Sequence, residues 1–124
     1  MASELRVNTL KDASGNNSIA TSFVAGGSAK ARHASNDAGT TLYGSLNVSS
    51  LGDTATGRQT ITFTTAMSDL NYSAVSGSGS QADGSARFML VNTLTTTSYN
   101  VNAYSAAVSL ADNSSSSAVH GDLA

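Results

Sequence analysis

The chain has 124 residues, no Cys, no Pro and a formal net charge of −2. This length accommodates one small domain, and the absence of Cys excludes disulfides, thiolate catalysis and Cys-based zinc sites. Charged residues make up only 11% of the chain. Without a basic stripe to neutralise phosphates, we expect no nucleic-acid partner and no attachment to an anionic membrane surface.

The hydropathy pattern predicts an all-β fold. Period-two alternation recurs along the chain, whereas helical stripes with a 3.6-residue period do not persist. No apolar run approaches the roughly 20 residues that a membrane-spanning helix needs. The N-terminus lacks the basic and apolar regions of a signal peptide, which indicates a protein made in a cytoplasm and not inserted into a membrane.

The first 24 residues predict a β-hairpin or extended arm. Apolar and β-forming side chains alternate on either side of a turn at residues 14–17. They are Leu5, Val7 and Thr9 before the turn and Ile19, Thr21 and Phe23 after it. Residues 25–41 are small and polar, with several turn formers, and predict a linker or irregular loop.

Residues 42–124 predict a small antiparallel β-sandwich of about seven strands, because strand signals recur every 8–12 residues or so. The clearest strand covers residues 58–65, where Ile61 and Phe63 face the core and Thr62 and Thr64 face outward. The other strands are expected near Leu46 and Val48, and at residues 71–75, 87–94, 99–103, 106–110 and 119–123. Loops or turns are expected at residues 77–84 and 114–117.

The strand edges carry no Pro and few charges, which are common protections against edge-to-edge pairing. A domain of this size also exposes much of its apolar surface as a monomer. We therefore expect identical subunits to cover these edges.

Candidate chemical motifs are weak. Gly77, Gly79 and Ala82 have the spacing of a dinucleotide fingerprint, but Asp83 and Gly84 continue a turn where that motif opens a helix. The carboxylates also lie in turn-like contexts. We assign no catalytic residue, no cofactor-binding residue and no cofactor, and expect a protein that is not an enzyme.

The two histidines, His33 and His120, have no partner at metal-ligand spacing. We interpret both as solvent-exposed and assign no metal ligand. In a trimer, a histidine near the symmetry axis can meet its copies and bind an ion, and the sequence leaves that alternative open.

Four tyrosines offer apolar faces with a polar tip, which suit either stacking on a sugar ring or packing in a core or interface. They are Tyr43, Tyr72, Tyr99 and Tyr104. Packing is the more frequent role.

Two blocks of sequence carry a family resemblance. The first reads SELRVNTLKDASGNNSI at residues 3–19 and FVAGGSAKA at residues 23–31. The second comprises NVSSL at residues 47–51, Thr56-Gly57, residues 60–67 and Asn71-Tyr72. Over about the first 75 residues the chain resembles small virion proteins of tailed phages of marine and freshwater bacteria, cyanophages among them. Family members often carry an aromatic-rich segment with a Trp after Ala-Lys-Ala, where this chain has Arg32-His33-Ala34-Ser35 and no Trp.

The resemblance implies a non-enzymatic phage structural protein, commonly a tail fibre or host-contact component, located in the virion after synthesis in the host cytoplasm. We expect a homotrimeric short tail fibre or fibre tip whose arm contacts tail or baseplate proteins. Residues 77–84 and 113–117 are expected to face a bacterial surface glycan. The alternative is a capsid decoration protein, of the cement or head-fibre type, with the arm lying across capsid subunits.

Overall fold

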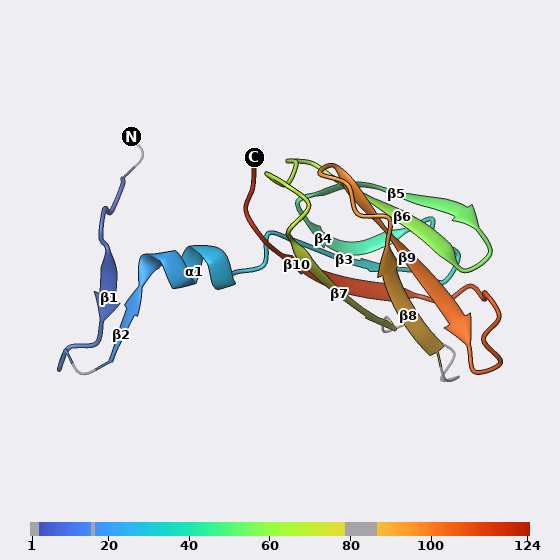
Figure 1. Ribbon diagram of the computed structural model, residues 1–124, viewed down its shortest axis with the longest axis horizontal. Coiled ribbons are helices and arrows are strands. Elements are labelled where there is room, and N and C mark those ends of the chain that lie inside the picture. The colour runs from blue at the N-terminus through green and yellow to red at the C-terminus, as the bar shows by residue number, and fades with distance from the viewer. Residues whose placement is uncertain (1–2, 16, 79–86) are drawn as a thin grey trace.

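A computed structural model describes residues 3–15, 17–78 and 87–124. Over these residues the fold is all-β, as predicted, with one short helix that was not predicted (Figure 1). An N-terminal hairpin pairs β1 (Thr9–Lys11) with β2 (Ser18–Ala20), and the helix α1 (Thr21–Gly27) connects it to the remaining strands. We call residues 3–27 the arm.

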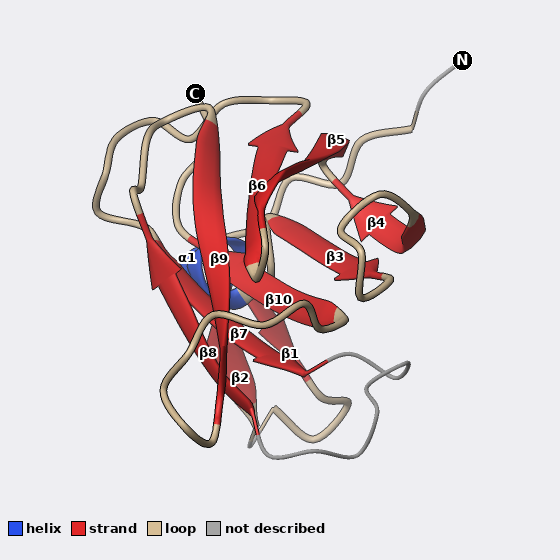
Figure 2. Cartoon of the chain, turned by 90° about the vertical axis from the view of Figure 1, so that its right-hand side faces the viewer, coloured by secondary structure: helices blue, strands red, loops and turns tan. Residues whose placement is uncertain are grey.

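Two four-stranded antiparallel sheets follow the arm and form a sandwich-like body. The first sheet has the order β4 (Leu42–Leu46), β3 (Ala31–Ser35), β10 (Ser115–His120), β7 (Ser73–Ser78). The second has the order β5 (Val48–Ala55), β6 (Arg58–Phe63), β9 (Ser98–Ser105), β8 (Arg87–Asn92). In Figure 2 the strands β6 and β9 cross β3 and β10 at an angle.

The hydrophobic core lies between the two sheets. In β6, Ile61 and Phe63 are buried while Thr62 is partly exposed, which confirms the predicted alternation. Phe63 packs against the rings of Tyr72 and Tyr99, with ring centroids 5.7 Å and 5.5 Å away. The first sheet contributes Ala31 and Val119, and Met67 from the segment after β6 is also buried in this core.

Strand β3 lies inside the stretch 25–41, so the expectation of a linker or irregular loop is wrong for residues 31–35. It is a central strand, paired with β4 on one side and β10 on the other. Its inward-facing residues are Ala31, His33 and Ser35. None of these is a large apolar residue, so hydrophobic alternation did not mark the strand.

The serine run is a second correction. Residues 115–117, expected in a turn, begin β10 at the centre of the first sheet. Conversely, residues 106–110 do not form a strand: only Leu110 makes an isolated bridge, to Tyr104, and Val108 has a positive φ of 61°. Of the loop expected at residues 77–84, Gly77 and Ser78 end β7, and residues 79–84 lie outside the described residues.

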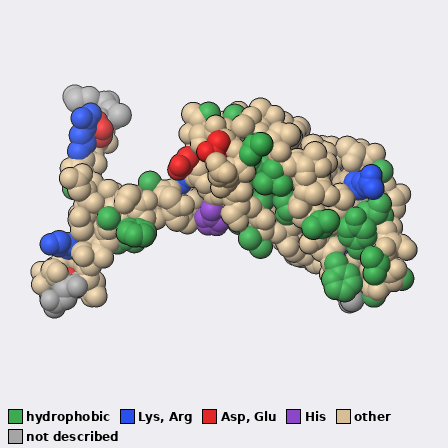
Figure 3. Space-filling model, in the orientation of Figure 1, with side chains coloured by type: hydrophobic (Ala, Val, Ile, Leu, Met, Phe, Trp, Pro, Cys, Tyr) green, Lys and Arg blue, Asp and Glu red, His purple; other side chains and the backbone are tan. Residues whose placement is uncertain are grey.

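The arm projects from one end of the sandwich (Figures 1 and 3). Its hairpin was predicted, but Thr21 and Phe23 lie in α1 instead of a second long strand. None of the described arm residues is buried. The backbone N–H of Lys30, just beyond the arm, donates to the Val119 carbonyl at 2.7 Å and fixes the point where the chain enters the first sheet.

Candidate functional site

A cluster of buried polar side chains lies between the two sheets, and we call it the His33 cluster. Alternation along β3 and β10 turns one side of each strand toward the second sheet. The cluster comprises His33 and Ser35 from β3, Ser115 and Ser117 from β10, and Gln59 and Tyr99 from the second sheet. The two sheets are therefore joined by hydrogen bonds as well as by apolar contact.

Both ring nitrogens of His33 face hydroxyl groups. Nε2 lies 2.9 Å from Ser115 Oγ. Nδ1 lies 2.7 Å from Ser117 Oγ and 3.1 Å from the Tyr99 hydroxyl. The hydroxyls of Tyr99 and Ser117 are also hydrogen-bonded to each other.

Gln59 closes the other side of the cluster. Its Oε1 accepts hydrogen bonds from Ser115 Oγ at 2.7 Å and Ser35 Oγ at 3.0 Å. Its Nε2 donates to the carbonyl oxygens of Asn113 at 3.3 Å and Asn36 at 3.4 Å. These four partners fix the orientation of the side-chain amide, because only the oxygen accepts and only the nitrogen donates.

Burial determines the charge state of the cluster. It lowers the pKa of His33 to about 4 and is the principal cause that raises the pKa of Tyr99 to about 12. Both side chains are neutral at pH 7. The expectation of a solvent-exposed His33 is wrong, since only 2% of its surface is accessible.

The Ser115–His33 pair has the atoms of a nucleophile and a general base, but it lacks the solvent access and the orienting group that catalysis needs. Covalent catalysis needs a substrate to reach the serine and a group that orients the histidine as a base. Ser115 is 1% exposed, and the far nitrogen of His33 faces hydroxyls instead of a carboxylate. The cluster is built to hold the two sheets together.

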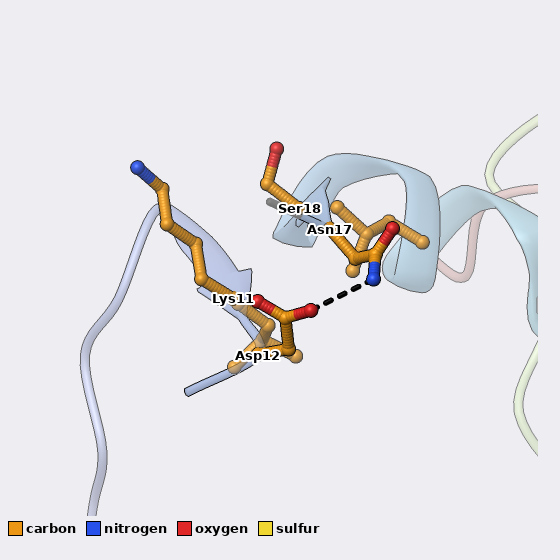
Figure 4. Close-up of a pocket in the computed structure, with 6 residues that line it drawn as sticks. Lys11, Asp12, Asn17 and Ser18 are labelled. Atoms are coloured by element: carbon orange, nitrogen blue, oxygen red, sulfur yellow. Dashed lines mark hydrogen bonds between the residues drawn. The ribbon is translucent and has the colours of Figure 1, made fainter. Parts of the chain in front are cut away.

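One surface hollow, of about 310 Å³, lies on the arm hairpin (Figure 4). Leu10 and Ile19 line it as cross-strand neighbours. At its rim, Asn17 Nδ2 donates to Asp12 Oδ2 at 2.7 Å, which closes the turn, while the Lys11 ammonium points away. The hollow thus combines an apolar floor with a hydrogen-bonded polar turn at its rim.

A second hollow, of about 440 Å³, lies on the outer face of β8 and β9, and its lining is almost entirely apolar. Phe88 is 60% exposed there and lies opposite Tyr104 across the two strands. Leu90 and Val108 complete the wall. Hydrophobic side chains gather at this end of the molecule, away from the arm (Figure 3).

The structure divides the four tyrosines into two groups. Tyr72 and Tyr99 are core residues, as the packing interpretation expects. Tyr43 is 55% exposed on β4, and Tyr104 is partly exposed beside Phe88. Only Tyr43 and Tyr104 among these four can offer a ring face to a ligand.

Within residues 3–15, 17–78 and 87–124, no group of three His, Cys, Asp or Glu side chains is placed to hold a metal ion. His120 is exposed at the end of β10, three residues beyond Ser117 of the buried cluster. In the same described ranges, no helix is long and apolar enough to cross a membrane. No protein-family model, no curated protein and no solved structure matches the chain.

Proposed function

We propose that this protein is a non-enzymatic structural component of a tailed-phage virion, a short tail fibre or fibre tip that assembles as a homotrimer through its N-terminal arm. The observation that supports this proposal is the exposure of apolar side chains on the arm. They are Leu5, Val7, Leu10, Ile19, Phe23 and Val24, each at least 39% exposed.

The arm has too little local structure to be stable alone. Its two-stranded hairpin has three residues in each strand, and isolated hairpins are marginal in water. Helix α1 has seven residues, includes Gly26 and Gly27, and has Ala20 as its N-cap residue, which offers no side-chain cap. Such a helix does not persist without packing. A neighbouring chain that covers Leu10, Ile19 and Phe23 supplies that packing.

The sandwich provides the other half of the proposal. Its core is built from strands after the arm, so it can keep its shape while the arm binds elsewhere. The uncharged hydroxyl and amide groups on its surface can hydrogen-bond to a bacterial surface glycan at modest desolvation cost. We no longer include residues 113–117 in the proposed glycan-contact surface, because residues 113, 114, 115 and 117 are buried.

Arm variants test the proposal in the phage. Phe23→Lys combined with Leu10→Lys places charges on the apolar side chains, and we expect particles that lack the protein. Thr9→Lys combined with Ser22→Lys is the matched control, since both residues are exposed, polar and adjacent in sequence to the mutated pair. Control particles should retain the protein. Equal incorporation of the two double variants would contradict a role for the apolar arm residues.

Immunogold labelling of intact virions locates the protein. We expect antibodies against the sandwich to label the tail and to reduce adsorption to host cells. Label over the capsid shell, with normal adsorption, would contradict the tail-fibre proposal and favour the capsid decoration protein. Particles without label would contradict both.

A further inference from the structure

The hydrogen bonds of the His33 cluster have a single direction, and Gln59 sets it. Gln59 Oε1 and Ser115 Oγ are 2.7 Å apart, a distance at which one oxygen must supply a proton. The amide oxygen has none, so Ser115 donates to Gln59. Ser115 Oγ then accepts the proton of His33 Nε2, 2.9 Å away.

This assignment also determines the protonation state of the opposite ring nitrogen, Nδ1. With its proton on Nε2, the neutral ring of His33 carries a lone pair on Nδ1. Of the two hydroxyls within reach of Nδ1, Ser117 Oγ at 2.7 Å is closer than the Tyr99 hydroxyl at 3.1 Å, and we assign Ser117 as the donor. Ser117 in turn accepts from the Tyr99 hydroxyl. The chain runs from Tyr99 through Ser117, His33 and Ser115 to Gln59, and each of its donors has an acceptor.

A proton added to the His33 ring breaks this chain. Nδ1 becomes a donor, so neither hydroxyl beside it can donate to it any longer. Ser117 and Tyr99 can share only one hydrogen bond between them, and neither hydroxyl has a further partner in the part of the chain that the structure describes, so one of their two protons is left without an acceptor. A buried donor without a partner costs about 1–3 kcal/mol.

Among the described residues, the groups that surround His33 offer no negative charge to compensate for the new positive charge. Ser45 of β4 and Ser117 of β10 lie beside His33 in the first sheet, and Tyr99 and Gln59 face the cluster from the second. Tyr99 is the titratable group among them, and its hydroxyl stays neutral up to about pH 12. Burial alone lowers the pKa of His33, without a contribution from any charged side chain.

We propose that the His33 cluster is a proton-sensitive lock between the two sheets, which is closed while the ring is neutral and opens when the ring takes up a proton. His33 and Ser117 belong to one sheet and Tyr99 to the other, so the unmatched donor lies at the junction between the two sheets. Mild acid therefore loosens the sandwich at its centre.

The direction and size of the effect follow from linkage. The unfolded chain binds a proton at His33 near pH 6.5, whereas the folded chain binds it only near pH 4. Stability is complete above about pH 6.5 and is lost as the pH falls from there toward 4. Between pH 7.5 and pH 5 the folding equilibrium constant should fall about 30-fold from this group alone.

His33→Gln tests the lock, because the Gln side chain offers an NH₂ donor group and a carbonyl acceptor in place of the neutral ring and does not titrate. Urea unfolding of the full chain at pH 7.5 and pH 5 should show that the folding equilibrium constant of the wild type falls roughly 30-fold between the two pH values. In His33→Gln this constant should change little. His120→Gln, which removes an exposed histidine, should keep the wild-type loss. The same loss in all three proteins would overturn the proposal.

Nitrogen NMR of the wild-type imidazole tests the same lock without a variant. We expect the His33 ring to be the Nε2–H tautomer and to remain neutral down to pH 5. A ring protonated on Nδ1, or one that becomes charged above pH 6 while the fold persists, would overturn the proposal even if His33→Gln failed to fold.

Discussion

Ile61 and Tyr99 lie directly opposite each other on β6 and β9, and neither side chain exposes any surface. The pair connects the apolar core of the sandwich with the hydrogen bonds of the His33 cluster. Ile61 belongs to the apolar core, and the Tyr99 ring packs in that core while its hydroxyl enters the His33 cluster. Apolar packing and the buried hydrogen-bond chain therefore depend on the same central strands.

Ile61→Asp should abolish the folded state, because a carboxylate at a fully buried site has no partner and costs more than about 4 kcal/mol. Phe63→Asp should do the same. Thr62→Asp is the control on the other side of the strand and should cost less than about 1 kcal/mol. Thermal unfolding followed by circular dichroism measures all three. Equal stability of Phe63→Asp and Thr62→Asp would show that the register of β6 is wrong.

Ser115→Ala should destabilise the protein by about 1–3 kcal/mol, since it leaves the Nε2–H donor of His33 buried without an acceptor. Ser117→Ala should cost less, because the Tyr99 hydroxyl is 3.1 Å from Nδ1 and can donate to it directly. Ser116→Ala, whose side chain points to the opposite face of β10, should cost least.

Urea unfolding at pH 7.5 ranks the three serine variants. The structure predicts the order Ser115, Ser117, Ser116 from the largest cost to the smallest. A larger cost for Ser117→Ala than for Ser115→Ala would contradict the direction assigned to the hydrogen-bond chain.

Gly57→Ala should cost about 2–4 kcal/mol, because two effects add. Gly57 has a φ of +68°, which side-chain-bearing residues rarely adopt. An added Cβ would also lie 2.6 Å from the Ala111 nitrogen and 2.7 Å from the Ala103 oxygen, both backbone atoms that cannot easily move.

Gly52→Ala is the matched control for that glycine. Its added Cβ would meet only the Thr60 carbonyl oxygen, at 4.0 Å, and its φ is unstrained. Chemical denaturation should show Gly52→Ala within about 1 kcal/mol of the wild type. Similar losses for both variants would mean that the turn at Gly57 tolerates a side chain.

Hydrophobic alternation was sufficient to predict β6 and the all-β class, because Ile61 and Phe63 are large, apolar and two residues apart. It failed for β3 and β10, whose inward faces carry His33, Ser35, Ser115 and Ser117. These residues are buried because they satisfy one another's hydrogen bonds across the sandwich. That pairing joins positions about 80 residues apart, and no local pattern reports it.

The arm shows the same limit from the other direction. The turn-forming residue types at residues 14–17 predicted the hairpin, and in the structure Gly15 takes a φ of +73°, which glycine adopts readily. The helix α1 was missed because Gly26 and Gly27 are poor helix formers and its seven residues show no apolar stripe. Because helix α1 is exposed in the structure, the proposal treats Phe23 as a binding residue.

Sedimentation equilibrium of the purified protein at micromolar concentration tests the central claim, that the arm assembles the protein, most directly. We expect the full chain to have about three times the 12.5 kDa mass of one chain. The Leu10→Lys, Phe23→Lys variant should have the single-chain mass and keep the circular dichroism of the sandwich. A wild-type chain that remains at 12.5 kDa, or a variant that assembles as the wild type does, would contradict the account.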